Sequence, residues 1–344
     1  MLWNAEHNYR KMPWKGEKDP YKIWLSEIIL QQTRVEQGLE YYNKFIEKYP
    51  KVELLAVADE NAVFKLWEGL GYYSRCKNLI ASARIIAFNY EGIFPNKYED
   101  ILKLKGVGPY TSAAIASFAF NLPYAVVDGN VLRVIARFFG IDAPIDSIEG
   151  KKMFTALAQT LMDAALPALY NQAIMDFGAT ICKPQLPLCS ICMLQKLCAA
   201  FAKNNVKELP VKQKKLIKRY RYFYYIVVEY NKKIYVRKRI SKDIWQNLWE
   251  FILVEKKEQI PVEEFIKSDD FTSLFKGKIM KTDTTIFYKQ QLTHQTIVGT
   301  FIYLKSKQPL INKLYVTINR EAISTLAFPR FITNFFEKNT DFKV

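Results

Sequence analysis

The sequence predicts a protein of two domains, a helical domain of about 200 residues followed by a smaller α+β domain. From residue 222 onward, aromatic and β-branched runs indicate strands. A basic stretch, residues 203–221, separates the two patterns. Before it, up to about Ala202, apolar residues recur at the three- and four-residue spacing of a helix, as in Ala113, Ile115, Ala116, Phe118 and Ala119.

Composition narrows the class of partner. The 344 residues include 50 Lys and Arg against 34 Asp and Glu, a net charge of +16. This excess of positive charge favours an anionic partner, usually nucleic acid. The alternative is that the charge only keeps the protein soluble. No apolar run is long enough to span a membrane, and the N-terminal residues lack the apolar core of a signal peptide. We therefore expect a cytoplasmic, nucleoid-associated protein without membrane contact.

Local signals set the helices that carry candidate site residues. Asp19 is a good N-cap and Pro20 a good first residue for a helix that contains Glu27. Two more helices are expected over Ser112–Phe120 and Leu132–Phe139.

In the smaller domain, Tyr222–Glu229 and Lys233–Arg237 are expected to form a hairpin around Tyr230–Asn231. A closing helix is expected over Phe328–Lys338. The other strand candidates are Leu248–Val254, Thr296–Leu304 and Lys313–Ile318.

The basic stretch between the domains holds eight Lys and Arg residues and the single acid Glu208. We expect it to be a solvated linker that either follows DNA phosphates or only joins the domains.

Four of the five cysteines stand together in a C-x6-C-x2-C-x5-C pattern. Four thiolates this close can surround one metal centre, either an iron–sulfur cluster or a zinc ion, and spacing alone does not decide between them. The fifth, Cys76, is expected to be an ordinary buried thiol. The predicted ligands are Cys182, Cys189, Cys192 and Cys198.

A Gly-Val-Gly turn precedes the helix expected at residues 112–120. Gly106 and Gly108 can adopt positive φ, and such a turn exposes backbone N–H groups at a helix N-terminus, where anions bind. Alone, the turn is weak evidence. Between two helices it resembles the hairpin of a helix-hairpin-helix element, which holds a DNA phosphate without reading sequence.

The carboxyl groups of Glu27 and Asp128 are expected to have complementary surroundings, one that retains a proton and one that retains a negative charge. Glu27 lies among apolar residues, which raise the pKa of a carboxyl group, so it can donate a proton near neutral pH. Asp128 begins a helix, where the dipole and the N–H groups keep a carboxylate ionised. Each alone is more often an ordinary helix-edge residue or cap. Together they supply a proton for a leaving base and an anion near a sugar cation, as cleavage of an N-glycosidic bond requires.

These motifs carry a resemblance. The cysteine loop, the Gly-Val-Gly turn and Val-Asp-Gly-Asn at 127–130 resemble the helix-hairpin-helix base-excision glycosylases. Ser-Glu-Ile-Ile-Leu-Gln-Gln-Thr at 26–33 and Trp67–Arg75 are similar to the MutY-type adenine DNA glycosylases within that superfamily. The resemblance implies an all-α catalytic region, residues 1–202, with a six-helix barrel at about 20–118. The other part, formed by residues 1–19 and 119–202, would carry a [4Fe-4S] cluster on the four cysteines.

The resemblance also implies an activity: base-excision repair of double-stranded DNA by removal of adenine mispaired with 8-oxoguanine or guanine. The base must be flipped out of the duplex to be reached. Glu27 would protonate the adenine and later activate water. Asp128 would stabilise the sugar cation, and Tyr110 and Asn130 would line the pocket. A monomer is expected. The residues implied to contact DNA are Gln32, Thr33, Arg34, Tyr72, Gly106, Gly108, Thr293 and His294.

Position 110 separates branches of the superfamily. Relatives of endonuclease III carry a lysine there, which attacks the sugar and allows strand cleavage. Tyr110 cannot form a Schiff base, so the resemblance implies a monofunctional glycosylase.

Residues 222–344 resemble the Nudix-like domain of the same family. The resemblance is based on the tripeptide Trp-Glu-Phe at 249–251. No Nudix hydrolase box follows, which implies recognition rather than pyrophosphate hydrolysis. The family reads 8-oxoguanine with a Phe-Ser-His loop, and Leu292, Thr293 and His294 stand at the matching place. Thr293 keeps the hydroxyl, while Leu292 lacks the aromatic ring.

Two other functions stay open: a thymine- or uracil-removing relative of the same fold, and a non-catalytic DNA-binding or damage-sensing protein. Glu27 and the long second domain favour adenine removal. A Glu27→Gln variant that loses turnover but keeps DNA binding would separate the enzyme from the binder.

Overall fold

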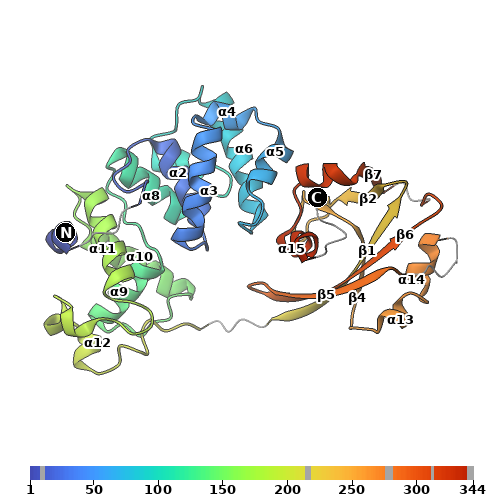
Figure 1. Cartoon of the computed structure of the whole chain (residues 1–344). Helices are drawn as coiled ribbons and strands as arrows, with labels where there is room; N and C mark the ends of the chain where they lie inside the picture. Colours follow the sequence, from blue (N-terminus) through green and yellow to red (C-terminus); the bar gives the residue numbers. More distant parts are fainter. Residues whose placement is uncertain (8–11, 214–217, 276–281, 311–313, 339–344) are drawn as a thin grey trace. The chain divides into compact units, whose positions relative to one another are not determined.

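The computed structural model describes residues 1–7, 12–213, 218–275, 282–310 and 314–338. Contacts divide the chain into a helical unit, Met1–Ala58 with Lys77–Lys215, and a sheet unit, Asp59–Cys76 with Leu216–Val344. Figure 1 labels most of the elements of both. Within the described ranges, no helix combines the length and the apolar character that crossing a bilayer requires.

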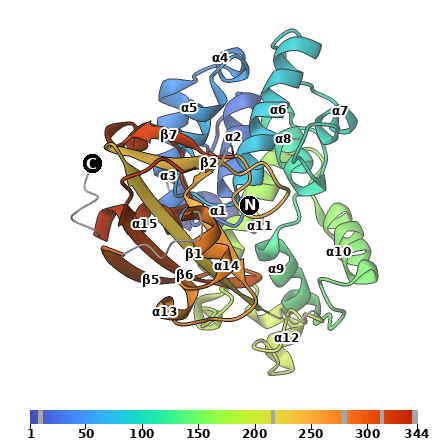
Figure 2. The same ribbon diagram turned by 90° about the vertical axis from the view of Figure 1, so that its right-hand side faces the viewer.

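Short helices joined by tight turns make up the helical unit (Figures 1 and 2). Those on which the candidate residues lie are confirmed, although α8 and α9 each begin three residues earlier than expected, directly after Gly108 and Asp128. The helices are α1 (Leu2–His7), α2 (Pro20–Leu30), α3 (Val35–Lys48), α4 (Val52–Ala56), α7 (Tyr98–Leu102), α8 (Pro109–Phe120), α9 (Gly129–Phe139), α10 (Ile148–Leu161), α11 (Pro167–Thr180), the 3-10 turns Cys189–Ile191 and Gln195–Leu197, α12 (Ala199–Ala202) and most of α6 (Tyr73–Asn89).

Helix α2 is buried along almost its whole length and packs against α3 and α8. Its start follows the sequence signals, since the Tyr21 N–H donates to Asp19 Oδ1 at 2.9 Å and Pro20 is the first helical residue. Trp24 and Ile29 are fully buried. This packing carries Glu27 into the interior.

The first part of the expected linker is not solvated. Leu209 is buried, and its carbonyl oxygen accepts from Arg137 Nε at 2.9 Å. The Ile145 N–H donates to the Val211 carbonyl at 3.0 Å, and the Gln213 N–H donates to Asp146. The expectation of a free linker from residue 203 is therefore wrong for residues 209–213, which pack on the helical unit, while residues 214–217 lie outside the described ranges.

The sheet unit is built on one seven-stranded sheet in the order β3-β2-β1-β6-β5, with β4 also paired to β1 and β7 to β2. Strands β1 and β6 run parallel, and the other pairs are antiparallel. The strands are β1 (Arg219–Tyr230), β2 (Lys233–Lys238), β3 (Trp249–Glu250), β4 (Ile252–Lys256), β5 (Thr284–Gln291), β6 (Gln295–Lys305) and β7 (Val316–Asn319).

Each face of the sheet buries its own core. On one face, Phe223, Tyr225 and Phe301 pack against α15 (Arg330–Lys338). On the other, Tyr224 and Ile302 pack with α13 (Val262–Phe265) and α14 (Asp269–Thr272). Figures 1 and 2 show α15 and the pair α13–α14 on opposite sides of the strands.

The strand predictions are confirmed in outline. The β1–β2 hairpin forms, with its turn at Asn231–Lys232, one residue later than expected, because both residues adopt positive φ. The strand expected at Leu248–Val254 is broken at Phe251, where pairing passes from β2 to β1. Strand β5 and helices α13 and α14 were not predicted from the sequence.

A segment from the first part of the sequence belongs to the sheet unit. Helix α5 (Glu60–Leu66) and the residues after it hydrogen-bond to the rest of that unit. Lys238 Nζ donates to Asn61 Oδ1 at 3.0 Å, Lys65 Nζ to the Leu326 carbonyl at 3.1 Å, and the Phe328 N–H to Glu68 Oε1 at 2.8 Å. Residues 59–76 therefore belong to the sheet unit and not to the all-α region expected over residues 1–202.

Candidate active site

A cavity of about 1130 Å³ opens in the helical unit between α2, α8, α9 and α11. It is large enough for a nucleobase and its sugar. Every site residue predicted between Glu27 and Arg34 lines it, as do Tyr110, Asp128 and Asn130, whereas Gly106, Gly108 and the four loop cysteines do not. The predicted residues in its wall are Glu27, Gln32, Thr33, Arg34, Tyr110, Asp128 and Asn130.

Glu27 is the carboxylic acid of this cavity. Its residue is only 8% exposed, and this burial raises the pKa of Glu27 from 4.5 to about 7. A hydrogen bond with the Tyr110 phenol favours the charged form and opposes that rise, and the negative charge of Asp128 adds to it. A carboxyl group with a pKa near 7 is half protonated at neutral pH, so Glu27 can both give and take a proton there.

The Asp128 carboxylate is held by more hydrogen bonds than the carboxyl group of Glu27. Its Oδ1 accepts from the N–H groups of Asn130 and Val131, both at 2.8 Å, and its Oδ2 accepts from Asn130 Nδ2 at 2.6 Å. These bonds lower the pKa of Asp128, as expected for an N-cap, but burial has the larger effect and the net pKa is raised. The expectation that Asp128 stays ionised depends on these bonds, which oppose the effect of burial. Three hydrogen bonds still favour the anion, against one for Glu27.

The close approach of α11 to α9 fixes Asn130. A Cβ atom on Gly178 would lie 2.7 Å from Asn130 Cβ and 3.0 Å from its carbonyl oxygen, so only glycine fits. Arg133 Nη2 completes the arrangement by donating to Asn130 Oδ1 at 2.8 Å and to the Gly178 carbonyl at 2.7 Å.

Arg133 also joins the cavity to the cysteine loop. Its Nε donates to the Cys182 carbonyl oxygen at 2.7 Å. One turn later on α9, Arg137 Nη1 lies 3.5 Å from Cys182 Sγ and donates to the Lys183 carbonyl at 2.7 Å. A continuous chain of contacts thus runs from Asp128 through Asn130 and Arg133 to the loop.

The cysteine loop brings its four thiols into one neighbourhood. All four are half-buried and free of disulfides. The pKa of Cys189 and of Cys192 is raised by burial first and then by the charges of the other loop cysteines. Among the described residues, however, no three His, Cys, Asp or Glu side chains converge on the position of one metal ion.

The hairpin before α8 differs from expectation in one glycine. Gly106 has φ +76°, and a Cβ there would lie 2.8 Å from Asn78, so glycine is required. Gly108 has φ −104° and serves as the N-cap of α8, and a Cβ atom there would meet open space. The prediction of positive φ is therefore wrong for Gly108, whose N-cap backbone is extended.

In the sheet unit, the structure brings Tyr72 and Thr293 together. The two hydroxyl oxygens lie 2.5 Å apart. Tyr72 is 43% exposed, has φ +48°, and its ring lies 5.4 Å from the guanidinium carbon of Arg75. Thr293 and the exposed His294 occupy the turn between β5 and β6, where the Leu292 N–H donates to the Gln295 carbonyl.

Several residues of the cavity wall were not predicted from the sequence. On α11, Gln172 Nε2 donates to Asp176 Oδ2 at 3.0 Å, and Lys15 Nζ lies 2.9 Å from the same oxygen. Trp14 also lines the cavity. The spacing of four residues between Gln172 and Asp176, which places both on one side of the helix, was the available signal.

Comparison with known proteins agrees with this geometry. Residues 25–160 match the family model of the HhH-GPD superfamily of base excision DNA repair proteins. The chain is 33% identical over 322 residues to an adenine DNA glycosylase of Buchnera aphidicola subsp. Baizongia pistaciae, covering 92% of this chain and 86% of that protein. This chain belongs to the adenine DNA glycosylase family.

Solved structures resemble the helical part of this family member. A thermostable thymine-DNA glycosylase is 34% identical with a TM-score of 0.55, covering 59% of this chain and 93% of that one. An endonuclease III–DNA complex is 20% identical with a TM-score of 0.51, over 59% and 93% of the two chains, which shows a shared fold.

Proposed function

We propose that this adenine DNA glycosylase family member removes adenine opposite 8-oxoguanine or guanine in double-stranded DNA, by base flipping and acid-assisted hydrolysis. The observation that supports this most directly is Glu27, a buried acid with a pKa near 7 in a cavity that can hold a base and its sugar, beside the anchored Asp128. Flipping is needed because the glycosidic bond is out of reach inside a duplex.

The reaction divides between the two carboxylates. Glu27 donates a proton to the adenine, the bond between the base and the sugar C1′ breaks with its electron pair leaving on the base, and Asp128 stabilises the sugar cation. Glu27, now ionised, takes a proton from water as the water oxygen bonds to C1′. Tyr110 offers no amine for a Schiff base, so we expect a monofunctional enzyme that leaves an abasic site.

Cys182, Cys189, Cys192 and Cys198 would hold a [4Fe-4S] cluster. Besides burial, the charges of the other loop cysteines raise the pKa of Cys189 and Cys192, so the thiols lie near one another, and cysteine thiolates are the ligands of such a cluster. Arg137 at Cys182 Sγ would offset part of the cluster's negative charge. Such a cluster would order the loop on which Arg133 and Arg137 are anchored, a structural role. Brown colour and iron content of the purified protein test the assignment.

Residues outside the cavity would position the duplex. The Gly106–Gly108 turn at the start of α8 would hold a phosphate. Tyr72 and Gln32 would occupy space left in the stack by the flipped adenine. Thr293 and His294 would read 8-oxoguanine from a Nudix-like domain. We expect a monomer, and sedimentation of a stable dimer would contradict this.

A second candidate is removal of thymine from mismatches, which the likeness to a thymine-DNA glycosylase favours. Base release measured on duplexes with adenine opposite 8-oxoguanine, guanine or thymine, and with thymine opposite guanine, separates the two. Release of adenine in the first two duplexes supports the proposal. Release of thymine alone would replace it with the second candidate.

A further inference from the structure

One end of the β-sheet carries two exposed aromatic side chains, Tyr220 and Phe287, and beside them Tyr222, which packs on the edge of the core under α13 and α14. The register of β1, β6 and β5 places Tyr220 beside Thr296 and Gln291, and Tyr222 beside Val298 and Lys289, all on one face. Two residues further on, Phe287 shares this face with Tyr224. Tyr224 lies under α13, whereas Tyr220 and Phe287 stay exposed.

The exposure is large for aromatic residues in a sheet. Tyr220 is 55% exposed and Phe287 58% exposed. The Tyr220 and Tyr222 rings stack with centroids 6.5 Å apart and an angle of 18° between their planes. Lys289 Nζ lies 5.6 Å from the Tyr220 ring centroid. We call Tyr220, Tyr222, Phe287 and Lys289 the aromatic face.

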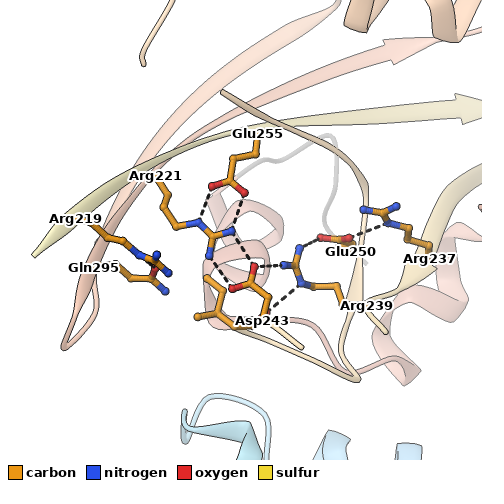
Figure 3. Close-up of polar contacts among 9 residues, drawn as sticks. Arg219, Arg221, Arg237, Arg239, Asp243, Glu250, Glu255 and Gln295 are labelled. Atoms are coloured by element: carbon orange, nitrogen blue, oxygen red, sulfur yellow. Dashed lines mark hydrogen bonds and ion pairs between the residues drawn. The ribbon is translucent and has the colours of Figure 1, made fainter. Parts of the chain in front are cut away.

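Positive charge predominates in the strand segments that form the aromatic face, while on the adjacent strand β4 Lys256, opposite Tyr222, is paired with Asp270. Residues 218–222 and 287–298 contain four Lys and Arg and neither Asp nor Glu. Arg221 points to the opposite face of the sheet, where Asp243 and Glu255 pair with it at 2.8 and 2.6 Å (Figure 3). Arg219, two residues before Arg221 on the strand, lies on that same opposite face, where its Nε donates to Gln295 Oε1. Lys218 and Lys289 remain as positive charge beside the aromatic face, which complements an anionic polymer.

We propose that the aromatic face binds unpaired DNA, with bases stacked on Tyr220 and Phe287 and phosphates held by Lys289 and its basic neighbours. Exposed aromatic rings on a sheet, next to cations, are the elements that bind single strands, because every base offers a π-face. A duplex presents phosphates on its outside and keeps its base faces covered, so it would leave these rings unused. The site is separate from the cavity of the helical unit.

The place of the aromatic face suits a protein that opens DNA. Gln291 and Tyr220 lie at the end of the strands next to the turn that carries Thr293 and His294. A nucleotide released from pairing close to that turn would find Phe287 on the same hairpin and Tyr220 on the adjoining strand β1. Stacking on these rings does not depend on which base the enzyme removes.

The test is fluorescence anisotropy of a labelled thymidine 12-mer with the full-length protein at several salt concentrations. Combined Tyr220→Ala and Phe287→Ala should weaken binding about 25-fold or more, at about 5-fold or more for each stacked base lost. Lys289→Ala should reduce the slope of log affinity against log salt by about 0.7. Phe88→Ala is the matched control, since Phe88 is an aromatic residue of the helical unit that is 66% exposed on α6, and it should change nothing.

Two further measurements keep the result interpretable. Tyr220→Phe should bind like the wild type, because stacking uses the ring and not the hydroxyl. Irradiation of a 4-thiothymine oligonucleotide bound to the wild type should crosslink peptides that contain Tyr220 or Phe287. Wild-type affinity in the folded double variant, or crosslinks confined to other peptides, would overturn the proposal and assign the face to a protein partner.

Discussion

The buried acid Glu27 should make the protein less stable as pH rises, and Glu27→Gln should remove this effect. Below pH 4.5 the carboxyl group is protonated in both the folded and the unfolded chain, so it contributes no pH dependence. Between 4.5 and about 7 the unfolded chain releases the proton while the folded chain keeps it. The unfolded state then binds fewer protons, so the free energy of unfolding falls with pH.

The size of the effect follows from the same pKa. At roughly 1.4 kcal/mol for each pH unit, the interval from 4.5 to about 7 corresponds to about 3 kcal/mol, reached once the pH exceeds 7. Glutamine has nearly the same shape and no charge. Glu27→Gln should therefore gain up to about 3 kcal/mol over the wild type between pH 4.5 and pH 8, while losing base release.

Urea unfolding followed by helical circular dichroism at pH 5 and pH 8 measures this gap. The free energy of unfolding of Glu27→Gln should exceed that of the wild type by clearly more at pH 8 than at pH 5. Glu47→Gln, an exposed side chain on α3, is the matched control and should show the same gap at both values. Equal gaps for Glu27→Gln at the two pH values would refute the account of a buried acid with a raised pKa.

Three more predictions test the site. Tyr110→Phe removes a hydrogen bond that favours ionised Glu27, so the alkaline limb of the pH–rate profile for base release should move to higher pH; an unchanged limb would contradict this. Arg133→Leu removes hydrogen bonds to the Asn130 side chain and to the cysteine loop, each worth about 1.5–3 kcal/mol. The single-turnover rate and the iron content should therefore fall together. A loss of rate at full iron content would argue against a link between the loop and the cavity through Arg133. Tyr72→Phe and Thr293→Val remove the same hydrogen bond. The double variant should therefore change the ratio of the rates opposite 8-oxoguanine and guanine by less than the sum of the two single effects. Additive effects would show that this hydrogen bond does not contribute to the preference for 8-oxoguanine.

Signals that act over a few residues were sufficient for part of the site. Asp19 and Pro20 set the start of α2, and with it the burial of Glu27. Asp128 could be recognised as an N-cap from the residues that follow it. These predictions needed no knowledge of distant contacts, and the structure places both carboxylates in one cavity.

Features that depend on distant contacts were not predictable. Arg133 looks like a charged residue on an amphipathic helix until α11 and the cysteine loop, 45 and 49 residues away, supply its acceptors. Leu209 is buried only because Arg137 and the chain near Ile145 hold the segment around it. The break at Phe251 reflects a change of strand partner, which periodicity does not encode.

The central claim is tested most directly by single-turnover base release from a duplex with adenine opposite 8-oxoguanine, with and without alkali, for the wild type and Glu27→Gln. The account predicts strand breaks at the adenine that require alkali, and their loss in Glu27→Gln, which should still bind the duplex. Breaks without alkali, or full activity in Glu27→Gln, would contradict it.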